Sequence, residues 1–103
     1  MGFKDPITQD QFDDAELTHW NLEDGELVAR LSLPTYAAGG QLVHKIAAYA
    51  DEVDHHPKLL LDYGILIVRS CSHDAGGVAT ARDLRLAQKV DALIGETGIT
   101  YQA

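Results

Sequence analysis

The sequence predicts a single α+β domain over residues 1–103, with a four-stranded antiparallel sheet and helices packed on one face. A chain of 103 residues has the size of one domain. Its strand-like segments come in two pairs, each joined by a short turn, as in β-hairpins. Segments whose apolar residues recur every three or four positions surround these pairs and predict helices. The predicted order is therefore α-β-β-α-β-β-α, with the helices covering one face of the sheet.

The N-terminal part predicts a short helix followed by a hairpin. Thr8 and Gln11 have the spacing of a capping box, so a helix is expected from Thr8 to about Leu17. Residues 20–22 and 26–33 flank the turn sequence "EDG". Apolar side chains alternate with others along the second of these segments, which indicates a sheet covered on one side.

The next segment predicts the longest helix of the chain. Thr35 is a suitable N-cap, and Pro57 disfavours helical geometry just before it, so the helix should end near Asp54. Gly39 and Gly40 indicate either close packing near the start of the helix or a later start. The buried stripe is expected to consist of Ala38, Leu42, Ile46, Tyr49, Ala50 and Val53.

A second hairpin and a last helix complete the domain. Residues 59–63 and 65–72 predict its two strands, and "HDAGG" predicts a loop after them. Thr80 and Asp83 form a second capping box, so a helix is expected from about Ala81 to Ile94.

Charge and cysteine content restrict the function. Sixteen acidic and eight basic residues give a formal charge of −8, which argues against binding nucleic acid or anionic lipid. No apolar run reaches the roughly 20 residues that span a membrane, and no signal peptide is evident. The single cysteine, Cys71, suits a reducing compartment and is expected to be a buried structural thiol. We therefore expect a cytoplasmic protein.

Residues able to do chemistry gather in two places. One cluster lies at the predicted end of the second helix, and the other lies where a strand ends. If that strand runs back beside the helix end, the two clusters meet in one pocket. The clusters are Asp51, Asp54, His55 and His56, and Ser72, His73 and Asp74.

These clusters admit three interpretations. Three histidines could bind zinc, copper or iron, but adjacent residues in an extended segment point apart, so His55 and His56 fit one ion poorly, and no metal is expected. The pair could instead end the helix, where positive charge is favourable. The third interpretation is proton transfer between histidines from different segments, because imidazole titrates near pH 6.5.

A family motif favours proton transfer. The stretch "DEVDHHP", Tyr63, "SHDAGG" and "ARDLRLA" occur in an order and spacing that resemble the pterin-4a-carbinolamine dehydratases. Two departures stand out: Leu59 replaces a frequent aromatic, and the segment from His73 to Asp83 is one residue longer than usual. The resemblance is strongest from Asp51 to about Asp91.

The resemblance implies a dehydratase that recycles the pterin of aromatic amino-acid hydroxylases. Its substrate would be a 4a-hydroxytetrahydropterin, which loses water to give the quinonoid dihydropterin without a metal, a further cofactor or a covalent intermediate. It also implies a homodimer or homotetramer assembled through the sheet edge and helices. The alternative is a non-catalytic binding module, since the same fold serves as a dimerisation partner of a transcription factor and as a Rubisco assembly factor.

The resemblance also assigns roles to individual residues. His55 and His73 would be the acid and base, and His56 would position the pterin. Trp20 would line the pocket or fill the core, and we expect the core. The residues expected to orient imidazoles or contact the substrate are Asp51, Asp54, Ser72 and Asp83.

Overall fold

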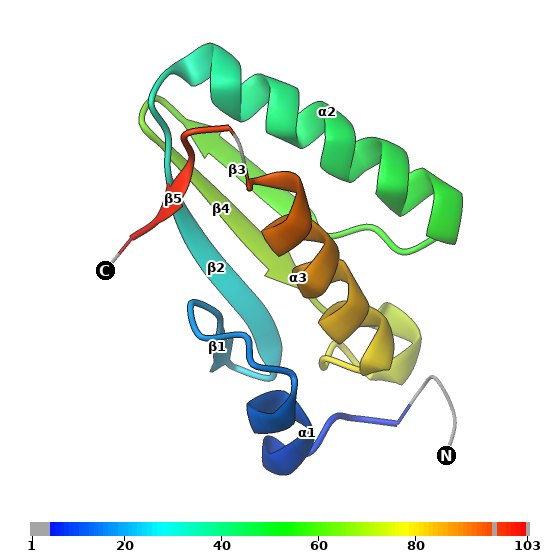
Figure 1. Ribbon diagram of the computed structural model, residues 1–103. Coiled ribbons are helices and arrows are strands. Elements are labelled where there is room, and N and C mark those ends of the chain that lie inside the picture. Colours follow the sequence, from blue (N-terminus) through cyan, green and yellow to red (C-terminus); the bar gives the residue numbers. More distant parts are fainter. Residues whose placement is uncertain (1–4, 96, 103) are drawn as a thin grey trace.

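The computed structural model describes residues 5–95 and 97–102 and shows a single α+β domain (Figure 1). Over these residues, three α-helices and a short 3-10 helix accompany four main strands and one two-residue strand. Their order along the chain is α1 (Gln9–Asp14), β1 (Asn21–Glu23), β2 (Glu26–Ser32), α2 (Tyr36–Val53), β3 (Lys58–Asp62), β4 (Ile65–Ser70), η1 (His73–Ala75), α3 (Ala81–Leu93) and β5 (Thr100–Tyr101).

The sheet is antiparallel and has the strand order β1-β2-β4-β3. The two predicted hairpins are therefore joined through their second strands, with Leu27 opposite Ser70 and Ser32 opposite Ile65. The sequence did not predict β5, which pairs with β2 at Leu31 and Ser32. A two-residue strand carries no periodicity, so its pairing depends on tertiary contacts.

The predicted helix starts are confirmed. Thr8 and Gln11 form the capping box of α1, the Thr35 side chain accepts from the backbone N–H of Ala38, and Thr80 with Asp83 caps α3. The first helix is shorter than predicted, because it ends at Asp14 rather than near Leu17. Leu17 is nevertheless buried and belongs to the core.

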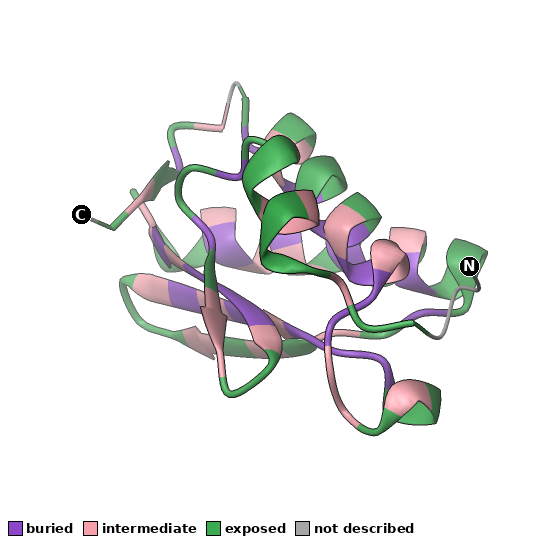
Figure 2. Ribbon diagram, turned by 90° about the horizontal axis from the view of Figure 1, so that it is seen from below, coloured by how far each residue is buried: buried purple, intermediate pink, exposed green. Residues whose placement is uncertain are grey.

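The core lies between the sheet and the helices α2 and α3, which share one face of the sheet (Figures 1 and 2). Buried residues lie where the strands and the two helices face each other (Figure 2). Trp20 is one of them, as predicted, and its indole N–H donates to Asp91 at 2.9 Å. The core consists mainly of Leu17, Trp20, Leu27, Ala29, Leu31, Leu42, Ile46, Leu66, Val68, Ala79, Ala87, Val90, Ile94 and Ile99.

Gly39 and Gly40 stand side by side in α2 and are expected to respond differently to alanine. A Cβ on Gly39 would lie 2.6 Å from the Cδ1 atoms of Leu33 and Leu61, whereas nothing lies within 4 Å of a Cβ on Gly40. We expect Gly40→Ala to raise the free energy of unfolding by about 1 kcal/mol, through helix propensity. Gly39→Ala should lack this gain, because displacing packed leucines costs roughly 1–3 kcal/mol. Urea unfolding measures both, and equal stabilisation at the two positions would contradict the close packing.

Candidate acid and base site

The side chains of His55 and His56, which follow the end of α2, point in opposite directions. Asp54 follows the helix in the left-handed conformation, with φ of 53°, and its N–H donates to the carbonyl of Ala50. The N–H of His55 donates to the same carbonyl at 3.0 Å. This tight turn buries His55, which is 8% exposed, and leaves His56 at the surface. The prediction that the two side chains point apart is confirmed.

His55 forms a hydrogen bond with a carboxylate that has no contact with solvent. Its Nε2 lies 2.6 Å from Oδ1 of Asp83, and Asp83 is 0% exposed. Asp83 belongs to the first turn of α3, where its other oxygen accepts from the backbone N–H of Thr80 at 2.8 Å. The capping box that starts α3 therefore also fixes the imidazole at the end of α2.

Further donors complete the surroundings of Asp83. The Ser70 hydroxyl donates to Oδ1, and the Ser72 hydroxyl donates to Oδ2 at 2.8 Å. The hydroxyls of Ser72 and Thr80 lie 2.8 Å apart. Ser70, Ser72 and Thr80 are each 0–1% exposed, so the network is closed to water. A buried carboxylate is tolerated when donors satisfy its lone pairs in this way.

This network determines which nitrogen of His55 is available for chemistry. Because the other groups around Asp83 donate to it, Nε2–H of His55 also serves as a donor, and the neutral ring then carries its lone pair on Nδ1. A carboxylate behind an imidazole fixes its tautomer and orientation, as in catalytic triads. The arrangement suits a histidine that accepts a proton.

The two predicted clusters meet in one pocket. A cavity of about 300 Å³ lies between the end of α2 and the turn η1, and three histidines from these two segments border it. His73 is exposed at the start of η1, next to Asp74. The residues that line the pocket are Asp54, His55, His56, His73, Asp74 and Arg82. Five residues of the two clusters therefore line one pocket, whereas Asp51 and Ser72 do not, and the roles of the residues stay predictions.

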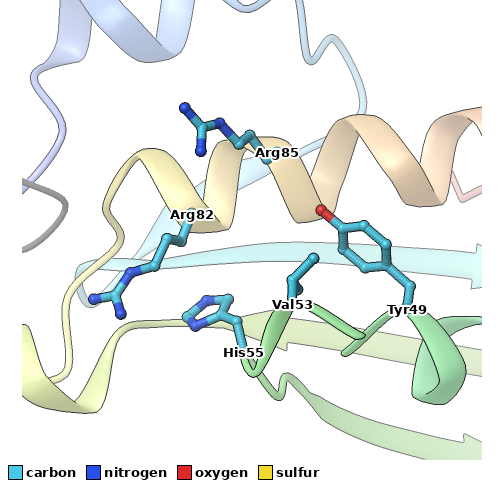
Figure 3. A pocket seen from close by; sticks show the side chains of 5 residues that line it. All are labelled: Tyr49, Val53, His55, Arg82 and Arg85. Carbon is cyan, nitrogen blue, oxygen red and sulfur yellow. The ribbon is translucent and has the colours of Figure 1, made fainter. Parts of the chain in front are cut away.

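A second pocket adjoins the first and was not predicted. It measures about 290 Å³ and shares His55 and Arg82 with the first pocket. Tyr49 and Val53 border it from α2 (Figure 3). In Figure 3, Arg82 extends from α3 toward His55, whereas Arg85 extends from the same helix away from it. The available signal in the sequence was a pair of arginines three positions apart on the last helix, Arg82 and Arg85. The sequence did not indicate that this helix lies beside α2.

Some predicted site residues lie behind or outside the pocket. Asp51 is exposed and is not among the residues that line the pocket. Its Oδ1 accepts a hydrogen bond from Nε2 of the exposed His56 at 2.9 Å. Ser72 and Asp83 lie behind His55, so their contacts support positioning of the imidazole, and direct contact with a substrate stays a prediction. Tyr63 is 84% exposed in the turn between β3 and β4.

Cys71 takes no part in these pockets. It is buried, as predicted, and burial followed by its hydrogen bond with Glu26 raises the pKa of the thiol. A raised pKa leaves less of the reactive thiolate at neutral pH. Within residues 5–95 and 97–102, no group of three or more histidine, cysteine or acidic side chains could hold a metal ion. Over the same residues, every helix is too short or too polar to cross a membrane.

Comparisons with known proteins agree with the motif. Residues 5–93 match the sequence profile of the family described as "Pterin 4 alpha carbinolamine dehydratase". A protein of Metallosphaera sedula provisionally named pterin-4-alpha-carbinolamine dehydratase is 40% identical over 75% of this chain and 79% of its own length. A Mycobacterium leprae protein with the same provisional name is 34% identical over 87% of this chain and 97% of its own.

Two solved structures share the fold. The transcriptional coactivator/pterin dehydratase of Brucella melitensis superimposes with a TM-score of 0.79 at 22% identity, covering 88% of this chain and 100% of that one. A pterin dehydratase-like protein described as a RuBisCO assembly factor gives a TM-score of 0.59 at 21% identity, covering 74% and 87%. On the profile match and the two sequence relatives, this chain belongs to the pterin-4a-carbinolamine dehydratase family.

Proposed function

We propose that this protein converts 4a-hydroxytetrahydropterin to quinonoid dihydropterin and water by histidine acid–base catalysis. The observation that carries the proposal is the pairing of a buried His55–Asp83 dyad with a second, exposed histidine, His73, in one pocket. The family supplies the class of substrate, since the relatives are named for pterin carbinolamine dehydration. The reaction needs one group to take a proton and another to deliver one.

The proposed step uses the two histidines in different roles. His55 accepts the proton of a ring nitrogen through Nδ1, because Asp83 holds the other nitrogen. The electrons of that N–H bond form a carbon–nitrogen double bond and expel the hydroxyl group from carbon 4a. His73 delivers a proton to the departing oxygen, which leaves as water. Atoms and charge balance without an oxidant or a covalent intermediate.

Two further polar residues at the pocket, His56 and Asp54, would hold the pterin. His56 and Asp54 border the cavity, and Asp51 fixes the ring of His56 through their hydrogen bond. A pterin presents alternating donors and acceptors along its edge, which carboxylates and imidazoles can match. The lone thiol Cys71 is in keeping with a reducing cytoplasm, where such a protein would recycle the pterin of aromatic amino-acid hydroxylases.

A direct turnover assay tests the proposal. Purified protein is added to 4a-hydroxytetrahydropterin generated in situ, and its spectroscopic decay is compared with the uncatalysed rate. We expect saturable acceleration that is proportional to protein concentration. No acceleration by a folded protein would instead favour the alternative of a non-catalytic binding module, as in a transcription-factor partner or an assembly factor.

We also propose a homodimer that pairs β3 with β3 of a second copy. β3 pairs with β4 on one side, and Leu60 at its centre is 57% exposed. Antiparallel pairing centred on Leu60 would place Lys58 opposite Asp62 of the other copy, so the charges are complementary. Joining two sheets in this way would also cover an open edge. A tetramer could form from such dimers.

Charge reversals along β3 test this assembly. Lys58→Asp and Asp62→Lys should each weaken the dimer, because each places like charges opposite one another. The double variant should restore it, because the charges are complementary again. Sedimentation velocity over a range of concentrations measures the change. A wild-type protein that stays monomeric, or a double variant no stronger than the singles, would count against pairing through β3.

A further inference from the structure

The two proposed catalytic histidines are held in place very unequally. His55 is buried and bonded to Asp83, whereas His73 is exposed and its imidazole has no hydrogen-bond partner among the described residues. The turn that carries His73 ends at Gly76 and Gly77, whose φ angles are 82° and 81°. No atom lies within 4 Å of a Cβ placed on either glycine, so packing does not restrain this part of the turn. Backbone hydrogen bonds within residues 72–78 hold the turn itself. A side-chain contact ties this turn to the rest of the site.

That contact is an ion pair between η1 and α3. Asp74, the residue after His73, accepts from Arg82 through both oxygens: Nη2 lies 2.5 Å from Oδ1, and Nη1 lies 3.2 Å from Oδ2. Arg82 immediately precedes Asp83, which holds His55. Two-point pairing of a guanidinium with a carboxylate fixes orientation as well as distance. The pair therefore links the turn bearing His73 to the helix turn that fixes His55.

Within the part of the chain that the structure describes, the side chain of Arg82 donates hydrogen bonds to Asp74 alone. Its Nε is buried and has no partner among the same residues. The hydrogen bond to Asp74 is the main reason that the pKa of Arg82 is raised. Among the described residues, removing the side chain thus breaks the connection to η1 and no other side-chain hydrogen bond.

We propose that Asp74 and Arg82 are positioning residues that hold His73 at its working distance from His55. The inference rests on the proposed function, because it concerns the geometry of the same proton transfers. A proton donor must lie within hydrogen-bond reach of the leaving oxygen. A misplacement of about 1 Å can lower a rate on the order of 100-fold.

Kinetics in two backgrounds test the proposal. In the wild-type background, Asp74→Ala and Arg82→Lys should each lower kcat by about 10- to 100-fold with little change in KM, since a lysine cannot form the two-point contact. In a His73→Ala background, Asp74→Ala should have almost no further effect, because the residue on which it acts is gone. An equal loss in both backgrounds, or no loss in either, would overturn the proposal.

Arg30→Met is the matched control. Arg30 forms a similar two-point pair with Glu23, at 2.6 and 3.0 Å, on strands remote from the two pockets. We expect this variant to keep the wild-type kcat. A loss as large as that of Arg82→Lys would show that breaking any such pair disturbs the fold, and would count against a specific role for Asp74 and Arg82.

An NMR measurement tests the same inference without turnover. Side-chain couplings and relaxation of a ring-labelled His73 should show one preferred rotamer in the wild-type protein and rotamer averaging in Asp74→Ala. Identical His73 behaviour in both proteins would overturn the positioning role, even if the dehydratase activity is confirmed. If the wild-type protein shows no turnover but His73 becomes more mobile in Asp74→Ala, the proposed function is refuted, whereas the positioning of His73 by Asp74 and Arg82 is supported.

Discussion

His55→Ala and His73→Ala are each expected to lower kcat for dehydration by about 10²- to 10⁴-fold. This is the usual contribution of a positioned general acid or base. His55→Ala removes the group that Asp83 holds through a 2.6 Å hydrogen bond, and His73→Ala removes the exposed imidazole across the pocket. Single-turnover kinetics on 4a-hydroxytetrahydropterin would separate the chemical step from product release.

His44→Ala is the matched control for these variants. His44 lies exposed on α2 and borders neither pocket, so its removal should leave kcat and KM unchanged. Circular dichroism and urea unfolding check that each variant is folded. Wild-type turnover in folded His55→Ala and His73→Ala would refute the proposed mechanism.

The pH dependence of the dehydration rate distinguishes which of His55 and His73 is the base and which is the acid. A base works when it is unprotonated, so its removal should abolish the rise of activity with increasing pH. An acid works when it is protonated, so its removal should abolish the decline at higher pH. We expect the first change in His55→Ala and the second in His73→Ala. The reverse pattern would exchange the two roles and leave the pocket as the site of reaction.

Local sequence rules predicted the elements that build this site. Pro57 indicated where α2 ends, and Thr80 with Asp83 indicated where α3 begins. Both signals depend on nearest neighbours along the chain, namely the conformation before a proline and the hydrogen bonds of a capping box. The divergence of His55 and His56 followed for the same reason, because it is set within the turn at Asp54.

The partners of the site residues could not be predicted in the same way. The carboxylate that fixes His55 is 28 positions away, and Arg82 faces Asp74 only because η1 folds back onto α3. The sequence shows Asp83 as a helix cap. Nothing local reveals that its second oxygen accepts from the imidazole of His55, or that the hydroxyl groups of Ser70 and Ser72 also donate to this carboxylate. These contacts depend on the β2–β4 pairing and on how the helices cross the sheet. The family motif indicated that Asp83 matters but not that it is buried.

Asp83→Ala is expected to lower the free energy of unfolding by about 3–5 kcal/mol, a large share of the stability of a domain this size. Asp83 is 0% exposed and accepts from His55, Ser70, Ser72 and the backbone of Thr80. Alanine leaves these donors buried without a partner, and each unsatisfied group costs about 1–3 kcal/mol before the structure relaxes. Urea unfolding measures the loss. A decrease below about 1 kcal/mol would contradict the closed network.

Asp83→Asn separates the support of the fold from the support of catalysis. An asparagine presents one oxygen and one NH₂ group where the aspartate presents two oxygens. The N–H of Thr80 cannot accept a hydrogen bond, so the amide oxygen should face Thr80 and the NH₂ group should face His55. Nε2 of His55 must then accept a hydrogen bond, which moves the ring proton to Nδ1 and removes the base from the pocket.

We therefore expect Asp83→Asn to lose less stability than Asp83→Ala, yet to lower kcat on the order of 10²- to 10⁴-fold. Near-normal kcat in the asparagine variant would show that the tautomer of His55 does not limit the reaction, and the base would have to be sought among His56 and His73 instead.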